Sequence, residues 1–367
     1  MTQYLRQTLA SIAASPLDAP QSMPGAFYTD QSLFDWECAT VLQNGWHCLG
    51  RADELPNVGD FFTQQLLNEP LLITRTQDGI HVLSNACRHR GMPVAKGAGN
   101  ANRHVCPYHA WAYAPDGKLL SAPRMRNAGF DPKTCALPAF ATQIHNGFIY
   151  ASLSDTPAPF DLAELDALIA PYEPENFRHV HTASEVWNCN WKALVENFME
   201  GYHLSVVHPE TLHHYTPTGL SRKGPSGRNF TSYFANYPDN AAGRGMGASG
   251  LSETERKRST LFAAYPTQVV SIAATTLVSL SIFPLSAEQI EVRWTLSTFG
   301  TELDDGILAN RIAVWNDVNR EDREKLEIMQ RALHSRHAVG GPLAGADYEG
   351  TVHDFQMWLA DQSEHLH

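Results

Sequence analysis

The sequence predicts an α+β protein, with an N-terminal all-β domain followed by an α+β domain whose helices lie on an antiparallel sheet. Three observations lead to this prediction. Short apolar or alternating runs joined by turn dipeptides fill the chain from about residue 46 to 153. Longer strand-like runs, from 269 to 299, lie between stretches with helical periodicity. A proline-rich connection at 155–175 separates the two patterns.

The elements of the first half follow in order. Residues 1–44 are expected to be a helical segment that packs on the second domain, beginning with a short amphipathic helix. Residues 45–155 are expected to form the all-β domain. Turn signals join its strands at Asp78-Gly79, Asp116-Gly117 and Asn146-Gly147.

Residues 156–367 are expected to form the second domain. A long helix is predicted from about Trp191 to Val207, because apolar residues recur there with helical spacing and Pro209 would end it. The stretch from Asn236 to Gly250 is rich in Gly, Asn and Ala and predicts a mobile loop. A final helix is predicted from about Asn319 to Ser335.

Composition excludes some classes of protein. The 367 residues carry a formal charge of −12, which argues against nucleic acid as a partner. No run of about twenty apolar residues occurs, so no membrane span is expected. The N-terminus lacks the pattern of a secretory signal, which predicts a cytoplasmic protein whose six cysteines are reduced.

Two mixed cysteine–histidine pairs lie in the predicted all-β domain. Cys87 and His89 form the first pair, and Cys106 and His109 form the second. Thiolates hold iron–sulfur clusters, and two histidines on one of the two irons make a Rieske centre of higher potential. The same ligand set can bind zinc, but zinc fingers usually pair Cys with Cys and His with His. The mixed pairs therefore favour a Rieske [2Fe–2S] cluster, with both cysteines on one iron and both histidines on the other.

A second candidate site lies on the predicted long helix. Glu200, His203 and His208 are spaced so that, on one continuous helix, the histidines are about 140° apart and the glutamate lies between them. Non-haem Fe(II) that binds dioxygen uses two histidines and one carboxylate, which leaves one face open. The spacing indicates a mononuclear iron site, and the alternative is a structural histidine pair.

The final helix offers a third ligand. It carries an apolar stripe of four residues: Val318, Leu326, Met329 and Leu333. Asp322 interrupts this stripe, and a buried charge there needs a partner or a metal. Glu321 is expected to form a solvated pair with Lys325. We therefore predict Asp322 as the third iron ligand, the alternative being an acid at a helix N-terminus.

Both motifs carry a family resemblance. Cys87–Gly91 and Cys106–Trp111 resemble the Rieske domain of Rieske non-haem iron oxygenases, although that family more often has Gly where Ala110 stands. Asn190–Glu210 resembles the family's catalytic motif. The resemblance covers nearly the whole chain and implies two cofactors, a 2Fe-2S Rieske cluster and mononuclear Fe(II).

The resemblance also implies roles for individual residues. His203 and His208 would bind iron, and Asn197 and Glu200 would be catalytic residues. Glu200 would accept one hydrogen bond from an iron ligand and another from a Rieske histidine of a neighbouring subunit. Many family members have Asp at this position. The segment around Asp322 is similar to the family's late carboxylate motif.

The implied partners follow from the same resemblance. No flavin or dinucleotide fingerprint occurs in the chain, so a separate NAD(P)H-dependent reductase, with or without a ferredoxin, would supply electrons. The chain would use O2 and a small-molecule substrate. The family typically forms trimers in which the cluster of one subunit serves the iron of the next, so a homotrimer is expected.

The substrate prediction rests on smaller similarities. Gly25–Asp30, Glu200 and His208–Glu210 resemble the branch that oxidises quaternary ammonium compounds such as choline, carnitine and betaines, by N-demethylation or C–N cleavage. Aromatic faces would hold such a cation. Six aromatic residues are candidates: Tyr215, Phe230, Tyr233, Phe234, Tyr237 and Phe283.

Two alternatives stay open. One is an aromatic-ring hydroxylating or O-demethylating oxygenase acting on an aromatic acid, which would need an apolar pocket with one basic anchor. The other is a Rieske electron carrier without oxygenase chemistry, which leaves His203, His208 and Asp322 unexplained.

Overall fold

The computed structural model describes residues 3–126, 129–241, 244–300 and 304–364. The chain divides into two compact units. Asn44–Pro159 form one, called here the all-β unit, while Met1–Gln43 and Phe160–His367 form the other, called the α+β unit. The predicted fold class is confirmed, whereas the domain assignment 1–44, 45–155 and 156–367 stays a prediction.

The all-β unit contains three small antiparallel sheets with strand orders β1-β10-β9, β4-β3-β2-β5 and β6-β7-β8. Its strands are β1 (His47–Arg51), β2 (Asp60–Leu66), β3 (Glu69–Thr76), β4 (Gly79–Ser84), β5 (Ala98–Asn100), β6 (His104–Val105), β7 (Ala112–Tyr113), β8 (Leu119–Ser121), β9 (Ala141–His145) and β10 (Phe148–Ser152). The three predicted turns each join paired strands: β3 to β4, β7 to β8 and β9 to β10.

One apolar cluster in this unit supports the loops that carry the cysteine–histidine pairs. The first loop follows β4 and the second joins β6 to β7. The cluster contains eight buried residues: Leu72, Leu83, Cys87, Val94, Cys106, Trp111, Tyr113 and Leu137. Both cysteines therefore belong to the core, which fixes the base of each loop.

The α+β unit is built on a seven-stranded antiparallel sheet with strand order β11-β17-β16-β15-β14-β13-β12. Its strands are β11 (Phe177–Trp187), β12 (Ser221–Gly227), β13 (Phe230–Asn236), β14 (Arg258–Ala264), β15 (Gln268–Ala273), β16 (Thr276–Ser286) and β17 (Gln289–Phe299). Its α-helices are α1 (Gln3–Ala13), α2 (Ala26–Thr29), α3 (Gln31–Glu37), α4 (Ala163–Ile169), α5 (Trp191–Phe198), α6 (Leu204–Val207), α7 (Glu253–Arg256), α8 (Asp305–Ala332) and α9 (Ala346–Glu364).

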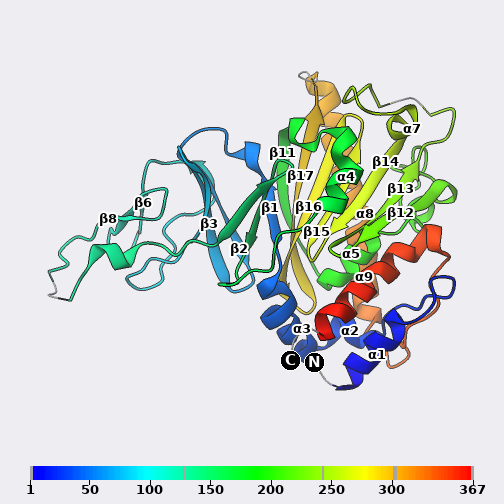
Figure 1. The fold of residues 1–367 in the computed structure, drawn as a ribbon, viewed down its shortest axis with the longest axis horizontal. Helices are drawn as coiled ribbons and strands as arrows, with labels where there is room; N and C mark the ends of the chain where they lie inside the picture. Colours follow the sequence, from blue (N-terminus) through cyan, green and yellow to red (C-terminus); the bar gives the residue numbers. More distant parts are fainter. Residues whose placement is uncertain (1–2, 127–128, 242–243, 301–303, 365–367) are drawn as a thin grey trace. The chain divides into compact units, whose positions relative to one another are not determined.

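Long helices of this unit pack on the sheet and on each other (Figure 1). α9 contacts β12 and β13, and α5 contacts β15 and β16. α8 contacts β11 and also meets α5 and α6, so it lies beside the segment that carries the candidate histidines. The N-terminal α1 packs on α9 near the other end of the chain.

The predicted long helix from Trp191 to Val207 is wrong. α5 ends at Phe198, and the short α6 begins only at Leu204. α9 stabilises the break, because Gly201 N–H donates to Tyr348 O at 3.0 Å and the Thr351 hydroxyl donates to the carbonyl of Met199. A side chain at Gly201 would meet the Ser221 hydroxyl at 2.1 Å, so only glycine fits this close approach to β12.

The final helix is longer than predicted. α8 begins at Asp305 rather than near Asn319, and the side chain of Asp304 accepts from Gly306 N–H as its N-cap. The predicted stripe is partly wrong as well, because Val318 and Leu326 are buried whereas Met329 is exposed.

The predicted loop from Asn236 to Gly250 follows β13. Positions 242 and 243 lie outside the described residues, and the described part beyond β13 contains no helix or strand. Its mobility stays a prediction. Among the residues that the structure describes, no helix is both long and apolar enough to cross a lipid bilayer.

Candidate metal centres

The two cysteine–histidine loops of the all-β unit have the same construction. In each loop the residue four positions after the cysteine donates its N–H to the cysteine carbonyl, Gly91 to Cys87 at 2.8 Å and Ala110 to Cys106 at 3.1 Å. Both donors have positive φ, +78° at Gly91 and +59° at Ala110. A turn closed in this way keeps the histidine of each loop close to its cysteine.

The donor atoms of these loops suit a Rieske cluster. The Cys87 and Cys106 side chains are each only 3% exposed, whereas His89 and His109 lie at the surface of the unit. The two histidine Nδ1 atoms are 3.1 Å apart, and Trp111 stacks on the His89 ring. Two metal–nitrogen bonds of about 2.1 Å at a right angle would separate the nitrogens by about 3 Å. The 3.1 Å between the two imidazole nitrogens is therefore compatible with both binding the same iron.

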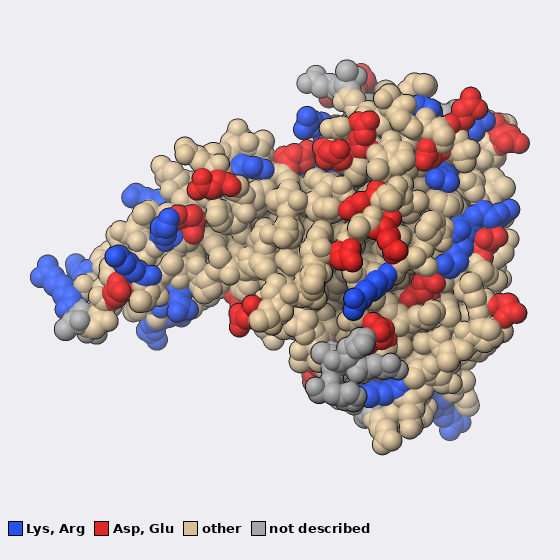
Figure 2. Space-filling model, viewed as in Figure 1, with Lys and Arg blue, Asp and Glu red and all other residues tan. Residues whose placement is uncertain are grey.

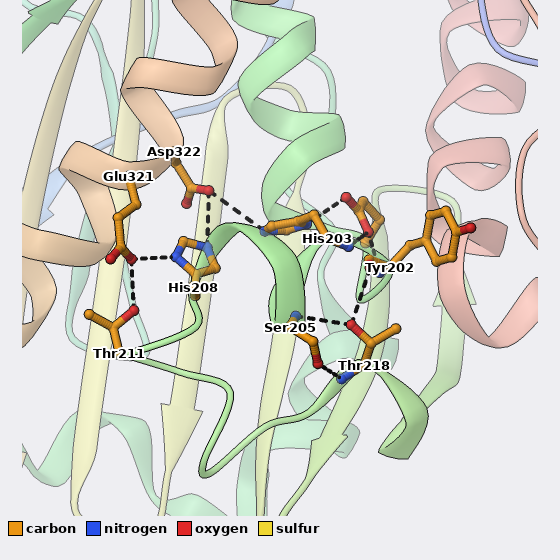
Figure 3. A network of polar contacts seen from close by, with 9 residues as sticks. Tyr202, His203, Ser205, His208, Thr211, Thr218, Glu321 and Asp322 are labelled. Atoms are coloured by element: carbon orange, nitrogen blue, oxygen red, sulfur yellow. Dashed lines mark hydrogen bonds and ion pairs between the residues drawn. The ribbon is translucent and has the colours of Figure 1, made fainter.

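In the α+β unit, His203, His208 and Asp322 meet although the predicted helix is broken. Their candidate ligand atoms all lie within 4.8 Å of one another. Asp322 Oδ1 lies 3.1 Å from His208 Nε2 and 3.6 Å from His203 Nε2 (Figure 3). Asp322 is 7% exposed, and this buried oxygen has no partner in hydrogen-bond geometry among the described residues. A buried carboxylate so placed suits a metal held by both histidines.

Two further carboxylates orient the histidines by hydrogen bonds to their Nδ1 atoms. His203 Nδ1 lies 2.5 Å from Glu200 Oε1, and His208 Nδ1 lies 2.8 Å from Glu321 Oε2. Thr211 donates to the same Glu321 oxygen at 2.7 Å (Figure 3). When a carboxylate accepts a proton from Nδ1, the Nε2 lone pair faces the metal. Both histidines therefore present Nε2 to the space beside Asp322.

The expected role of Glu321 is wrong. Its side chain turns inward to His208 and Thr211 instead of pairing with Lys325. The sequence did not predict the contact of Glu321 with His208, because Asp322 already supplied the expected iron ligand and because Lys325, four residues after Glu321, offered a pairing partner. The position of Glu321 directly before Asp322 could have indicated the contact. Successive residues on a helix are about 100° apart, so both side chains can border one site.

Electrostatics in the triad favour ionised groups despite burial. Burial raises the pKa of Asp322, but His208, His203 and Asn197 outweigh it and hold the pKa below its usual value. For His203, burial lowers the pKa, but the charges of Glu200 and Asp322 raise it above the ordinary value. A carboxylate that stays charged in this place can bind a cation strongly.

Asn197 and Glu200 lie around the triad as well. Asn197 Nδ2 is buried without a hydrogen-bond partner among the described residues, and its amide contributes to the lowered pKa of Asp322. Glu200 also accepts from the backbone N–H groups of Tyr202 and His203 through Oε2. Asn197 therefore lies beside Asp322, whereas Glu200 lies on the Nδ1 side of His203, away from the candidate iron position.

The six candidate aromatic residues divide into two groups. Phe230, Tyr233 and Phe283 are buried in the unit. The other three contact cations of the chain itself. Arg258 lies over Phe234, and Arg244 lies over both Tyr215 and Tyr237. These three rings already have cations on their faces in this structure.

Paired cysteine–histidine loops in a small all-β unit, together with a buried two-histidine, one-carboxylate triad beside a large antiparallel sheet, define the class of Rieske non-haem iron oxygenases. Residues 45–141 match the family described as Rieske [2Fe-2S] domain. Residues 174–365 match the family described as ring hydroxylating alpha subunit (catalytic domain). The chain belongs to this ring-hydroxylating alpha subunit family, and its cofactors are a Rieske cluster and mononuclear iron.

The individual relatives are similar to this chain over a little more than half of its length. The chain is 35% identical over 218 residues to the glycine betaine monooxygenase oxygenase subunit of Chromohalobacter salexigens, covering 58% of this chain and 49% of that protein. It is 31% identical over 206 residues to the carnitine monooxygenase oxygenase subunit of Escherichia coli K12, covering 54% of this chain and 55% of that protein. The chain spans about half the length of the curated relatives it matches.

A solved structure of a quaternary ammonium Rieske monooxygenase, bound to an inhibitor, shares the fold. The TM-score is 0.84 at 21% sequence identity, over 97% of this chain and 98% of that chain. At this identity the likeness establishes the fold alone.

Proposed function

We propose that this chain is the oxygenase component of a Rieske monooxygenase that hydroxylates a quaternary ammonium compound, which leads to N-demethylation or C–N cleavage. The buried triad of His203, His208 and Asp322 carries the proposal, since an electron carrier would not need it. The names of the two curated relatives support the substrate class. The product of turnover separates this function from the aromatic-acid alternative, as the test below describes.

The proposed ligands follow from the donor atoms. Cys87 and Cys106 would hold one iron of the cluster, and His89 and His109 the other. His203, His208 and Asp322 would hold the mononuclear iron. When bound, the cluster supplies single electrons, and ferrous iron with an open face supplies dioxygen activation.

The surrounding residues would hold both histidines in one orientation. Glu200 and Glu321 accept from the Nδ1 atoms of the two histidines, so each imidazole turns its Nε2 toward the proposed iron position. Asn197 would act as a donor beside Asp322 and hold its carboxylate in place. Glu200 is the proposed bridging residue toward a Rieske histidine of a neighbouring subunit in a homotrimer.

A separate NAD(P)H-dependent reductase, with or without a ferredoxin, is the proposed electron source. Residues 44–159 contain ten Lys and Arg against eight Asp and Glu, although the whole chain has a formal charge of −12. Basic side chains gather at the end of the all-β unit where β6 and β8 lie (Figure 2). Such a surface would attract an acidic electron donor. A cytoplasmic location stays a prediction from the sequence.

Turnover with a reductase tests the proposal. Glycine betaine, carnitine, choline and benzoate are supplied separately to iron-loaded enzyme, and products are identified by mass. Loss of a methyl group with release of formaldehyde from an ammonium compound is the expected result. A hydroxylated or demethylated aromatic acid as the sole product would establish the alternative. Reduction of the cluster without any oxygenated product would refute oxygenase function.

A further inference from the structure

The segment between the two candidate histidine ligands has little structure of its own. α6 occupies only Leu204–Val207, and His208 N–H donates to Leu204 O at 3.2 Å. All four residues of α6 lie in the described part of the chain, and of these Leu204 is buried whereas Val206 is 81% exposed. A single helical turn is unstable in water without tertiary contacts. The spacing of His203 and His208 therefore depends on contacts that reach α6 from other segments.

Thr218 holds the middle of α6. Its hydroxyl accepts from Ser205 N–H at 3.1 Å, and its own N–H donates to Ser205 Oγ at 2.9 Å (Figure 3). The same hydroxyl donates to the carbonyl of Tyr202, directly before His203, at 3.1 Å. These three hydrogen bonds connect α6 to the large sheet, because β12 begins at Ser221, shortly after Thr218.

Thr211 acts at the other end of the segment. Its hydroxyl donates to Glu321 Oε2 at 2.7 Å, and the same oxygen lies 2.8 Å from His208 Nδ1 (Figure 3). The last torsion of a glutamate side chain is only weakly restricted, so a second donor on this oxygen holds the carboxylate in place. The partner of His208 is thus positioned by a residue that follows His208 in the same loop.

The two threonines belong to one loop, residues 209–218, called here the 209–218 loop. Turns make this loop compact: His213 N–H donates to His208 O at 3.0 Å, and Thr216 N–H donates to Leu212 O at 2.8 Å. The loop begins directly after the second histidine and returns to contact α6. It can therefore constrain both ends of the segment that carries the histidines.

We propose that Thr211 and Thr218 are positioning residues for the mononuclear iron site. Thr211 acts through Glu321, and Thr218 acts through the backbone of α6. Together they set the distance and the angle between the imidazoles of His203 and His208. The inference rests on the proposed iron ligands but goes beyond the proposed function, because it does not depend on which substrate is oxidised.

Threonine-to-valine variants test the proposal, because valine keeps the branched shape and removes the hydroxyl. Thr211→Val and Thr218→Val should each raise the Kd of Fe(II) at the mononuclear site about 2- to 10-fold, the range for a lost hydrogen bond. The double variant should combine both effects, to about 4- to 100-fold, since the two contacts are separate. Competition with a chelator measures the Kd in protein that keeps its Rieske cluster.

Thr216→Val is the matched control. Thr216 lies in the same loop, and its hydroxyl donates to Leu212 O at 3.3 Å, so this hydrogen bond stays within the loop. The control should leave the Kd for iron unchanged. Thr211→Ser and Thr218→Ser keep the hydroxyl and should restore iron binding nearly to that of the wild type.

A spectroscopic measurement separates positioning from a general loss of stability. Nitric oxide is added to the ferrous site of each variant at equal iron content, and the EPR spectrum of the adduct is recorded together with the Rieske signal. A displaced imidazole should change the symmetry of the adduct spectrum in both valine variants, whereas the Rieske signal should stay the same. Circular dichroism checks folding. If Thr218→Val does not fold, Ser205→Ala removes one hydrogen bond of the same pair.

The outcomes separate this inference from the proposed function. Weaker iron binding in both valine variants, with recovery in the serine variants and no change in Thr216→Val, supports the positioning role. If serine and valine variants behave alike, or if Thr216→Val has the same effect, the inference is refuted even when betaine turnover continues. If no ammonium compound is turned over but the pattern of Kd values holds, the proposed function falls and the positioning role remains.

Discussion

In the all-β unit the candidate ligands come from two short loops of one design, whereas in the α+β unit they come from a broken helix and from a second helix more than a hundred residues later. The cluster histidines are exposed and their cysteines are buried. In the triad, by contrast, Asp322 and His208 are both buried. An electron relay needs a ligand edge near the surface, while a site that activates dioxygen must limit water.

The two regions also differ in how they fix their histidines. Hydrogen bonds to the carboxylates Glu200 and Glu321 orient the triad histidines. His89 instead stacks on Trp111 and faces His109. The buried site therefore depends on charged groups that are costly to bury, and the exposed site depends on the backbone of its loops.

The largest difference between the two metal sites is expected when one residue of the triad is replaced. His208→Ala and Asp322→Ala should each lower the iron content from about three to about two per chain and reduce turnover by about 10³-fold or more, because the mononuclear site loses a ligand while the cluster keeps all of its ligands. Iron analysis and the Rieske EPR signal measure both sites in one sample.

Cys106→Ser is the reciprocal variant. It should remove the Rieske signal and leave about one iron per chain. If either change empties both sites, the two regions are not independent in the way that the division into two compact units indicates.

Glu321→Gln addresses the orienting carboxylates. The variant should weaken iron binding at the triad by about 10- to 100-fold, since the amide leaves His208 with a weaker acceptor. Competition with a chelator gives the affinity. Glu324→Gln, an exposed neighbour on the same helix that pairs with Arg320, is the control and should have no effect. Equal effects of the two changes would mean that the contact with His208 contributes nothing.

The same contrast explains what the sequence could predict. The cluster loops are local motifs, and Cys87, His89, Cys106 and His109 could be predicted as ligands from spacing alone. Asp322 was predictable because a charge interrupted an apolar stripe. The helix break after Phe198 was not predictable, because contacts from Tyr348 and Thr351 stabilise it and these residues lie about 150 positions later. Glu321 was misinterpreted for a similar reason, since its inward orientation depends on Thr211.

The buried carboxyl of Glu196, in the α+β unit, should make the stability of the protein depend on pH. Burial raises the pKa of this carboxyl from 4.5 to about 7, although the Tyr28 hydroxyl donates to it at 2.6 Å and Lys192 also lowers it. A raised pKa means that the neutral form is favoured in the folded state, so its stabilising contribution is complete below pH 4.5 and is lost as the pH rises through about 7.

Glu196→Gln should therefore stabilise the protein at high pH. The amide stays neutral and still accepts from Tyr28, so the variant should match the wild type near pH 4 and exceed its free energy of unfolding by on the order of 3 kcal/mol near pH 8. Denaturant unfolding at both pH values is the measurement. A difference that does not change with pH would show that Glu196 is ionised throughout.

The smallest effect is expected at Ala110 in the second cluster loop. Its φ of +59° is unfavourable for an L-residue, whereas the equivalent position of the first loop is Gly91 at +78°. Ala110→Gly should raise the free energy of unfolding by up to about 1 kcal/mol, because relief of the left-handed strain is partly offset by the greater freedom of glycine when unfolded.

Gly91→Ala is the reciprocal control. No atom outside its neighbours lies within 4 Å of the added methyl group, so any loss of stability comes from φ alone. Thermal unfolding of cluster-loaded protein should move in opposite directions for the two variants, with the cluster potential unchanged, and a shift in the same direction would mean that the loops differ in more than this one backbone angle.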